Sequence, residues 1–541
     1  MSRSWKILAI SAFCSCLLLG GFFGDRLLAV TEETREGLRL YTDLLTAAHD
    51  NYAGDTSYKE LVWASIQGLL RPLDPHTAFL TPEAYNSMRE KQQSTYFGLG
   101  LLVGIRNNQL TVISPIEGSP AARLGMRAGD VISDIEGQPT EKMTLDEAVN
   151  KLKGPKGTQV HVTVVRVGLD RPLELTVTRA EIPQTTVRYA YMLEPGTGYI
   201  LISDFGRGTG DEVATAIEKL RGQGMKRLLL DLRNNGGGLL DAAIDVADQF
   251  LPKGSKIVET RGRTRDSFQQ YAAAGNHPVL GMPLVVLVNN GTASASEIVS
   301  GAIQDHDFGL IVGTPTWGKG LVQSVYNLPY GAGLALTTAK YYTPSGRLIQ
   351  RDYSSYLDYL YNHAESADNP HDGGATAPAT PQKPGTEYAT DLGRKVYGGG
   401  GITPDVKVEP NEVPVFAQYL FAHNAFFNFA VERDGRQPPT RDWKPDAGLL
   451  DQFKAWLLAQ KISTAEELDK AFADDATRAF TQRQIQAEMF NATFGLEAGH
   501  QVQAGGDVQI QAALKAFPRA AELLAARQSL GQAKTQRAAL P

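Results

Sequence analysis

The stretch "PLVVLVNNGTASASEIVSGAIQD", residues 283–305, decides the fold of the largest part of this chain. An apolar run of strand length is followed by the turn signal "NNG" and then by a helical pattern. The same alternation of strand and helix precedes and follows it. Such alternation favours a largely parallel sheet covered by helices. The other alternating segments are "GYILISDF", "GDEVATAIEKLRGQG", "RLLLDLRNNGGG", "LLDAAIDVADQFL" and "GLIVGTPT".

The pattern changes toward the N-terminus, between Phe97 and about Ile182. Short strands surround one helix there, in "GLLVGI", "LTVISPI", "DVISDIEG", "TLDEAVNKLK", "QVHVTVVRV" and "PLELTVTRA". This element order resembles a PDZ domain. The predicted fold class is therefore mixed α/β, with a PDZ domain ahead of an α/β core.

A chain of 541 residues is too long for one hydrophobic core, so several domains are expected. Helical periodicity frames the two central domains on both sides, and one segment rich in Pro, Gly, Ala and Thr predicts a disordered insertion. The predicted parts are a signal peptide or membrane anchor (1–29), a helical N-terminal region (30–92), the PDZ domain (95–182), the core (183–410) with the insertion (365–388), and a helical C-terminal extension (411–541).

The first residues predict export from the cytoplasm. Arg3 and Lys6 precede the apolar stretch 7–24, which contains no charge. This arrangement is typical of a signal peptide or an uncleaved anchor, and the sequence leaves both open. The predicted location is the bacterial periplasm or the outer face of the inner membrane.

Composition limits the partners and the chemistry. The net charge of -6 without a long basic run argues against a nucleic-acid partner. Cys14 and Cys16, the two cysteines of the chain, both lie in the export segment. The exported part then has no cysteine nucleophile and no thiolate metal site, and we expect no metal or cofactor.

The hydroxyls after residue 288 raise the question of a nucleophile and its base. A serine needs a base within hydrogen-bond reach, and the chain has neither G-x-S-x-G nor S-x-x-K. His306 follows Ser294 by twelve residues, which is roughly 18 Å along a helix and too far. Lys319 is the other candidate. It stands between two glycines and is flanked by Trp317 and Leu321, where burial can lower a lysine pKa far enough to give a neutral amine, and a solvated turn lysine is the alternative.

Several motifs in order resemble one family. They are "DPHTAFLTP", "DLRNNGGGLL", "GTASASEI", "PTWGKGLVQ", "KYYTPSGRLIQ" and "YGGGGITPDV". Over residues 35–410 the chain resembles the carboxyl-terminal processing proteases, the tail-specific serine peptidases of family S41. The resemblance implies a ClpP/crotonase-like α/β core.

The resemblance also assigns catalytic roles. It implies Ser294 as the nucleophile, Lys319 as the base and Gln323 as the residue that orients the base. Ser296 is the alternative hydroxyl, although packing or capping of the helix with Glu297 is the simpler reading.

The same comparison implies an oxyanion hole made of backbone N–H groups. Ala295 would donate one bond from the helix N-terminus. The second donor would be Gly237, with its neighbour Gly238 as the alternative. Gly236 stands where the family usually carries proline, which leaves the identity of the donor glycine open.

The segment "STYFGLGLLV", residues 94–103, resembles the carboxylate-binding loop of PDZ domains. Phe97, Gly98, Leu99 and Gly100 would form this peptide-binding loop, and a captured peptide would add a strand to the domain. The predicted partners are therefore proteins or peptides with exposed C-termini.

The sequence predicts an exported serine endopeptidase that recognises C-terminal tails and cleaves through an acyl-enzyme. The alternatives are a catalytically idle PDZ scaffold or chaperone that binds unfolded tails, and another hydrolase on a related sheet fold. An adaptor protein and a homo-oligomer both stay open. Residues 35–90 and the helices after 411 are candidate assembly surfaces.

Overall fold

The computed structural model describes residues 32–275, 281–354, 385–434 and 438–538. The predicted export segment, with both cysteines, lies outside them, as does most of the predicted insertion. No helix within the described ranges is long and apolar enough to cross a membrane. The same residues contain no group of three or more His, Cys, Asp or Glu side chains placed to hold a metal ion.

The core is built on a six-stranded sheet, in which β10 is antiparallel to β11 and every other neighbouring pair is parallel. Its strands, in spatial order, are β10 (Val187–Glu194), β11 (Thr197–Ile202), β12 (Arg227–Asp231), β15 (Leu284–Val288), β16 (Leu310–Gly313) and β21 (Val406–Lys407). Every residue of β15 is buried, because both faces of the sheet are covered.

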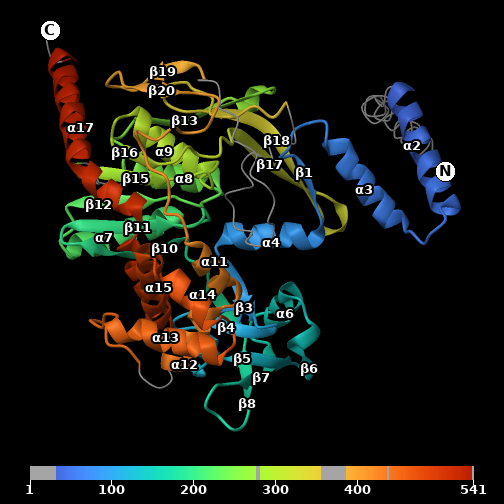
Figure 1. The fold of residues 1–541 in the computed structure, drawn as a ribbon. Helices are drawn as coiled ribbons and strands as arrows, with labels where there is room; N and C mark the ends of the chain where they lie inside the picture. Colours follow the sequence, from blue (N-terminus) through green and yellow to red (C-terminus); the bar gives the residue numbers. More distant parts are fainter. Residues whose placement is uncertain (1–31, 276–280, 355–384, 435–437, 539–541) are drawn as a thin grey trace, which may run out of the picture.

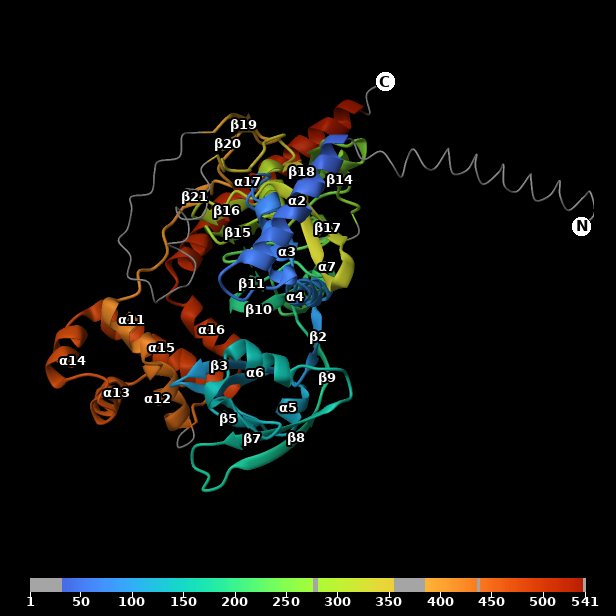
Figure 2. The same cartoon turned by 90° about the vertical axis from the view of Figure 1, so that its right-hand side faces the viewer.

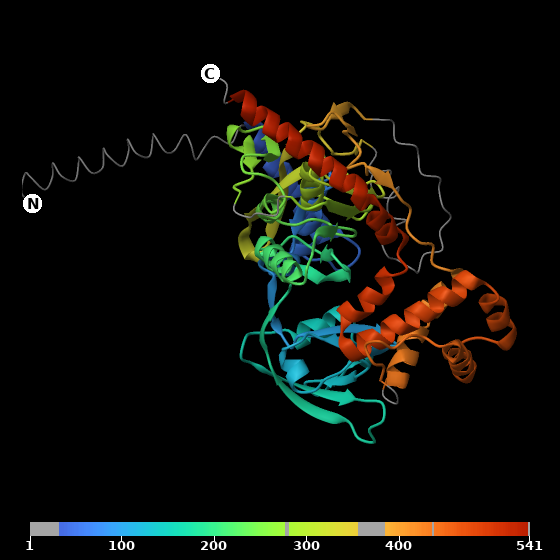
Figure 3. The same cartoon turned by 90° about the vertical axis from the view of Figure 1, so that its left-hand side faces the viewer.

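Alternate residues of β15 face different helices. Val286 and Val288 pack into the cluster that contains α9, while Val285 and Leu287 pack against the last helix. Figures 1 and 3 show the long helix α17 running along one side of the core, with α8 and α9 on the other. The covering helices are α7 (Thr209–Gly222), α8 (Leu240–Asp248), α9 (Ala295–Asp305) and α17 (Val508–Ala538).

A second sheet joins the N-terminal region to the core. Its strands are β1 (Ala78–Leu80), β18 (Gly333–Tyr342), β13 (Lys256–Gly262), β14 (Gln269–Ala272) and β17 (Leu321–Asn327), which pairs with β18. The helical N-terminal region thus also contains a strand, β1, which pairs with β18. The helices of this region are α2 (Glu32–Asn51), α3 (Tyr58–Leu70) and α4 (Pro82–Gln93). Helices α2 and α3 project from the side of the core (Figure 1).

The PDZ domain has its own hydrophobic core and lies beyond a two-stranded connection to the protease core. The connection pairs β2 (Thr95–Gly98) with β9 (Ala180–Pro183) in antiparallel fashion. The domain contains β3 (Leu101–Arg106), β4 (Gln109–Pro115), α5 (Pro120–Arg123), β5 (Val131–Ile135), β6 (Gln138–Pro139), α6 (Leu145–Leu152), β7 (Gln159–Val165) and β8 (Leu173–Thr178).

The C-terminal extension forms a helical domain beside the PDZ domain before α17 returns to the core (Figures 1 and 2). The Arg106 guanidinium of β3 lies 5.9 Å from the centre of the Phe427 ring. The helices are α11 (Val415–Ala422), α12 (Ala425–Asp434), α13 (Ala447–Ala459), α14 (Ala465–Phe472), α15 (Asp475–Phe494) and α16 (Leu496–Ala504). A hairpin of β19 (Glu387–Ala389) and β20 (Lys395–Tyr397) precedes them, so the last two residues of the predicted insertion, Glu387 and Tyr388, lie in a strand.

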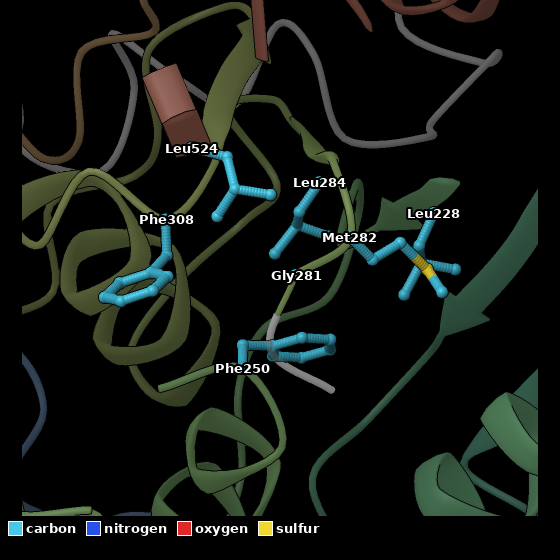
Figure 4. A pocket seen from close by; sticks show the side chains of 7 residues that line it. All are labelled: Leu228, Phe250, Gly281, Met282, Leu284, Phe308 and Leu524. Carbon is cyan, nitrogen blue, oxygen red and sulfur yellow. The ribbon is translucent and has the colours of Figure 1, made fainter. Parts of the chain in front are cut away.

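One small cavity between the core and α17 is apolar and has a volume of about 10 Å³. Figure 4 shows Leu524 of α17 facing it together with Phe308 and Leu284. A space of this size holds at most one water molecule and offers no room for a substrate.

Candidate active site

A much larger cavity, of about 610 Å³, brings together the residues that the sequence singles out for catalysis. Ser294, Lys319 and Gln323 line it, together with the glycine loop 236–238 and Ala295. Helix α4 contributes Met88, Lys91 and Gln92 to its wall. The cavity is therefore formed by the core, the β17–β18 pair and the N-terminal region.

Ser294 lies at the turn between β15 and α9. Its backbone has φ 55° and ψ -114°, a conformation that costs a non-glycine residue about 1–3 kcal/mol. Such strain persists only where surrounding contacts fix it, and here the Ser294 N–H donates to Glu297 Oε2 at 2.8 Å. The turn places the serine directly before the first residue of α9, where unpaired N–H groups favour negative charge.

Lys319 lies in the loop between β16 and β17. Its Nζ donates to Gln323 Oε1 at 3.1 Å. Burial lowers the pKa of Lys319, while the carboxylates of Glu297 and Asp74 oppose the shift. The Gln323 amide in turn donates to the carbonyl oxygen of His76. Lys319 is thus a partly desolvated amine held in place through Gln323.

Glu297 fixes the backbone of both residues. This fully buried carboxylate accepts the N–H of Ser294, the N–H of Lys319 at 2.9 Å and the N–H of Gly318 at 2.8 Å. The Thr316 hydroxyl donates to the same carboxylate. Burial raises the pKa of Glu297, and the donated hydrogen bonds oppose this effect.

Tyr341 binds the same two residues through their carbonyl oxygens. Its hydroxyl lies 3.0 Å from the carbonyl oxygen of Ser294 and 2.5 Å from that of Lys319. Glu297 and Tyr341 therefore link the nucleophile turn to the lysine loop through backbone N–H and C=O groups respectively. Sequence reasoning gave neither residue this role, although both stand in the motifs "GTASASEI" and "KYYTPSGRLIQ".

The glycine loop presents its N–H groups unequally. The Gly237 N–H, which the sequence favoured as the second oxyanion donor, donates to Asn235 Oδ1 at 2.9 Å. The N–H groups of Ala295, Gly236 and Gly238 have no acceptor among the described residues. The N–H of Gly238, the alternative, thus has no partner in this conformation, whereas Gly237, which lies against the Ser294 turn, would first have to leave Asn235.

Two other candidate side chains, those of Ser296 and His306, do not line this cavity. The Ser296 hydroxyl is buried and donates to the carbonyl oxygen of Asn235 at 2.9 Å. His306 ends α9, and its ring nitrogens contact Asp391 Oδ2 at 2.9 Å and the carbonyl oxygen of Lys256 at 2.7 Å. His306 is a buried histidine at the C-terminal end of α9 and does not line the cavity.

The "DPHT" segment, residues 74–77, binds Gln323, the partner of Lys319, through the His76 carbonyl oxygen. Asp74 accepts bonds from the Thr77 hydroxyl at 2.7 Å and from the Thr337 hydroxyl at 3.1 Å, which attaches the segment to β18. Burial lowers the pKa of His76 to about 4, and the nearby Lys319 charge acts in the same direction. The imidazole is therefore neutral at physiological pH.

The predicted peptide-binding loop opens the PDZ domain. Phe97 is half-exposed, while the Leu99 side chain is buried in the domain core. Gly100 has φ 75°, and its carbonyl accepts the Ser119 hydroxyl at 3.1 Å. The N–H groups of Leu99 and Gly100 have no acceptor among the described residues, an arrangement that suits a bound carboxylate.

Comparison with known proteins defines the class. A model of peptidase family S41 matches residues 196–354, and a PDZ domain model matches residues 111–166. The fold and these matches describe a serine peptidase with a PDZ domain. The chain belongs to the S41 family of carboxyl-terminal processing proteases, which confirms the predicted family, fold class and enzyme class.

Two relatives support this assignment. The carboxy-terminal-processing protease of Bartonella bacilliformis is 39% identical over 323 residues, which cover 59% of this chain and 74% of the relative. The carboxyl-terminal-processing protease of Synechocystis sp. is 43% identical over 303 residues, or 54% and 69% of the two chains. A solved photosystem II D1 C-terminal processing protease is 28% identical, with a TM-score of 0.35, over 68% of this chain and 92% of its own.

Proposed function

We propose that this protein is an exported endopeptidase that captures C-terminal tails on its PDZ domain and hydrolyses peptide bonds with Ser294 and Lys319. One observation carries the proposal. A lysine with a pKa lowered by burial, held by Gln323, lines the same cavity as a strained serine at a helix N-terminus. A solvated structural lysine would need none of these features.

The reaction follows the acyl-enzyme route. Neutral Lys319 takes the Ser294 proton as Oγ forms a bond to the peptide carbon, and N–H groups of Ala295 and the glycine loop receive the oxyanion. The lysine then protonates the leaving amine as the peptide bond breaks. It next removes a proton from water, which attacks the ester, and the serine oxygen regains a proton as the acid leaves.

The test compares wild-type protein with Ser294→Ala on an unstructured protein substrate. Both should bind it, and only the wild type should cut it. Treatment with a serine-reactive fluorophosphonate, followed by mass spectrometry, should place the adduct on Ser294 rather than Ser296. A wild type that binds tails without cutting them would favour the idle scaffold, and cleavage by the alanine variant would exclude Ser294 as the nucleophile.

Export rests on the sequence of residues 1–29, where Arg3 and Lys6 precede the apolar stretch. Fusion of this segment to alkaline phosphatase, which folds in an oxidising compartment, should give active phosphatase in a bacterial host. Replacement of the apolar residues Leu8, Ala9, Ile10 and Ala12 by serine should abolish the signal. Inactive phosphatase from the unaltered fusion would argue for a cytoplasmic protein.

Self-association through α2 and α3 is the assembly that we propose within residues 35–90. The side chains of Leu38, Leu44 and Leu69 are 57%, 65% and 72% exposed, an unusual state for so many leucines on two adjacent helices. Sedimentation should show a species larger than the monomer, and Leu44→Asp should shift it to the monomer. A monomeric wild type would contradict this assembly.

A further inference from the structure

The glycine loop of the active site follows an ion pair at the end of β12. Asp231 is fully buried and accepts bonds from the Arg233 guanidinium, the shortest at 2.6 Å. It also accepts the Arg233 backbone N–H at 2.9 Å. Asp231 and the β12 strand thus set the position of Arg233, three residues before Gly236.

The C-terminal extension supplies the remaining partners of Arg233. Arg233 Nη1 donates to Asp507 Oδ2 at 2.7 Å and to Gln509 Oε1 at 2.9 Å. Gln509 is 2% exposed, and its amide donates to the carbonyl oxygen of Val408. Asp507 Oδ1 accepts the N–H of Ile510 at 3.1 Å, so one carboxylate caps α17 and binds the arginine.

His500 of α16 approaches Asp231 indirectly, through Tyr199. The His500 ring stacks on Tyr189 with centroids 4.4 Å apart, and its Nδ1 lies 3.0 Å from the Tyr191 hydroxyl. The ring also lies 5.4 Å from that of Tyr199, whose hydroxyl donates to Asp231 Oδ2 at 2.7 Å. The extension therefore contacts Arg233 directly through Asp507 and Gln509, and it reaches Asp231 indirectly through His500 and Tyr199.

Downstream of Arg233, the loop is attached to the nucleophile turn. The Asn234 N–H donates to Asn289 Oδ1 at 2.8 Å, and Asn289 Nδ2 donates to Asn234 Oδ1 at 2.7 Å. The Asn235 carbonyl accepts the Ala293 N–H at 3.0 Å. A displacement of Arg233 would therefore move both the glycine loop and the turn that carries Ser294.

We infer that Asp507 is a positioning residue for the peptidase reaction: through Arg233 it fixes the loop that supplies an oxyanion donor, with Gln509 as the second support. This role lies in a part of the chain beyond the S41 match, which ends at residue 354. It rests on the proposed Ser294 and Lys319 chemistry.

The test separates the ion pair from the helix cap. Asp507→Ser keeps a side chain that caps α17 well but is too short to reach Arg233, whereas Asp507→Ala loses both functions. Since small misplacements of catalytic groups are costly, both variants should lower kcat on the order of tenfold, with KM unchanged. The melting temperature should fall in the alanine variant and stay near the wild-type value in the serine variant. Asp469→Ala, whose side chain is 84% exposed in the same extension, is the control.

A wild-type kcat in Asp507→Ser overturns the inference, because it would show that only the cap matters. A loss confined to KM also overturns it. The outcome is distinguishable from failure of the proposed function. If Ser294→Ala is inactive and Asp507→Ser is normal, only the role of Asp507 fails. If Ser294→Ala still cleaves, the proposed chemistry itself fails.

Discussion

Two glycine-containing loops, "NNGGG" in the core and "FGLG" at the start of the PDZ domain, both contain backbone N–H groups that have no acceptor among the described residues. Their surroundings differ. The core loop is tied to the nucleophile turn through Asn234 and Asn235, and to the C-terminal extension through Arg233. The PDZ loop is held by the Ser119 hydroxyl and a few backbone bonds, with Phe97 half-exposed.

This contrast follows from what each loop is proposed to do. A transition-state donor must be fixed before the charge develops, because reorganisation during the reaction would cost rate. A loop that captures different tails gains from partial freedom. Changes in the core loop should therefore appear in kcat, and changes in the PDZ loop in KM.

The largest effect should come from Lys319→Ala, which leaves both loops intact. Loss of the base should lower kcat by about 10⁴-fold or more, while tail binding stays at the wild-type level. Steady-state cleavage and binding of a fluorescent tail peptide measure the two quantities. Lys340→Ala, on the exposed side of β18, is the matched control and should cleave normally. Retained cleavage in Lys319→Ala would contradict the proposed role of Lys319 as the base.

Gly238→Ala should break the core loop. A Cβ at this position would lie 2.1 Å from the carbonyl oxygen of Phe205, and the φ of 150° disfavours alanine. We expect kcat to fall by about 10²–10³-fold, the loss typical of one oxyanion donor. Gly236→Ala is the control, since a Cβ there meets nothing within 4 Å. Equal rates in the two variants would mean that the loop needs no fixed geometry.

The pH profile tests the state of the base. Burial lowers the pKa of Lys319, so below this pKa the amine is charged and inactive. kcat/KM should rise about tenfold per pH unit and level off below the ordinary lysine value of 10.5. Because Asp74 raises the Lys319 pKa, Asp74→Asn should move the rise to lower pH. A rise centred at the ordinary lysine value would show that the cavity does not desolvate the amine.

Gly100→Ala should have the smallest effect and should change KM. A Cβ would lie 2.3 Å from the Ser119 Cβ, at a φ of 75°, and would distort the loop. Loss of about one hydrogen bond to a bound carboxylate predicts a five- to tenfold rise in KM for tailed substrates, with kcat retained. Gly104→Ala on β3 has ordinary room at 3.6 Å and serves as the control. An equal rise for a substrate with an amidated C-terminus would argue against carboxylate recognition.

Local pattern and resemblance predicted much of this molecule. Strand and helix alternation indicated the parallel core, and motif order gave the family. The resemblance implied Ser294, Lys319 and Gln323, three residues that the structure finds around one cavity. The strand β1 was not expected, because a three-residue strand has no periodicity and exists only through its pairing with β18.

The sequence by itself determined which side chains could supply the chemistry, because a strand, a turn and a helix at fixed spacing are local properties. Only the tertiary structure decided how these groups are held. The Tyr341 hydroxyl binds the carbonyl oxygens of Ser294 and Lys319, and Arg233 binds Asp507 across 274 positions of the chain. Contacts between such distant residues depend on how whole elements pack, and no local pattern encodes that packing.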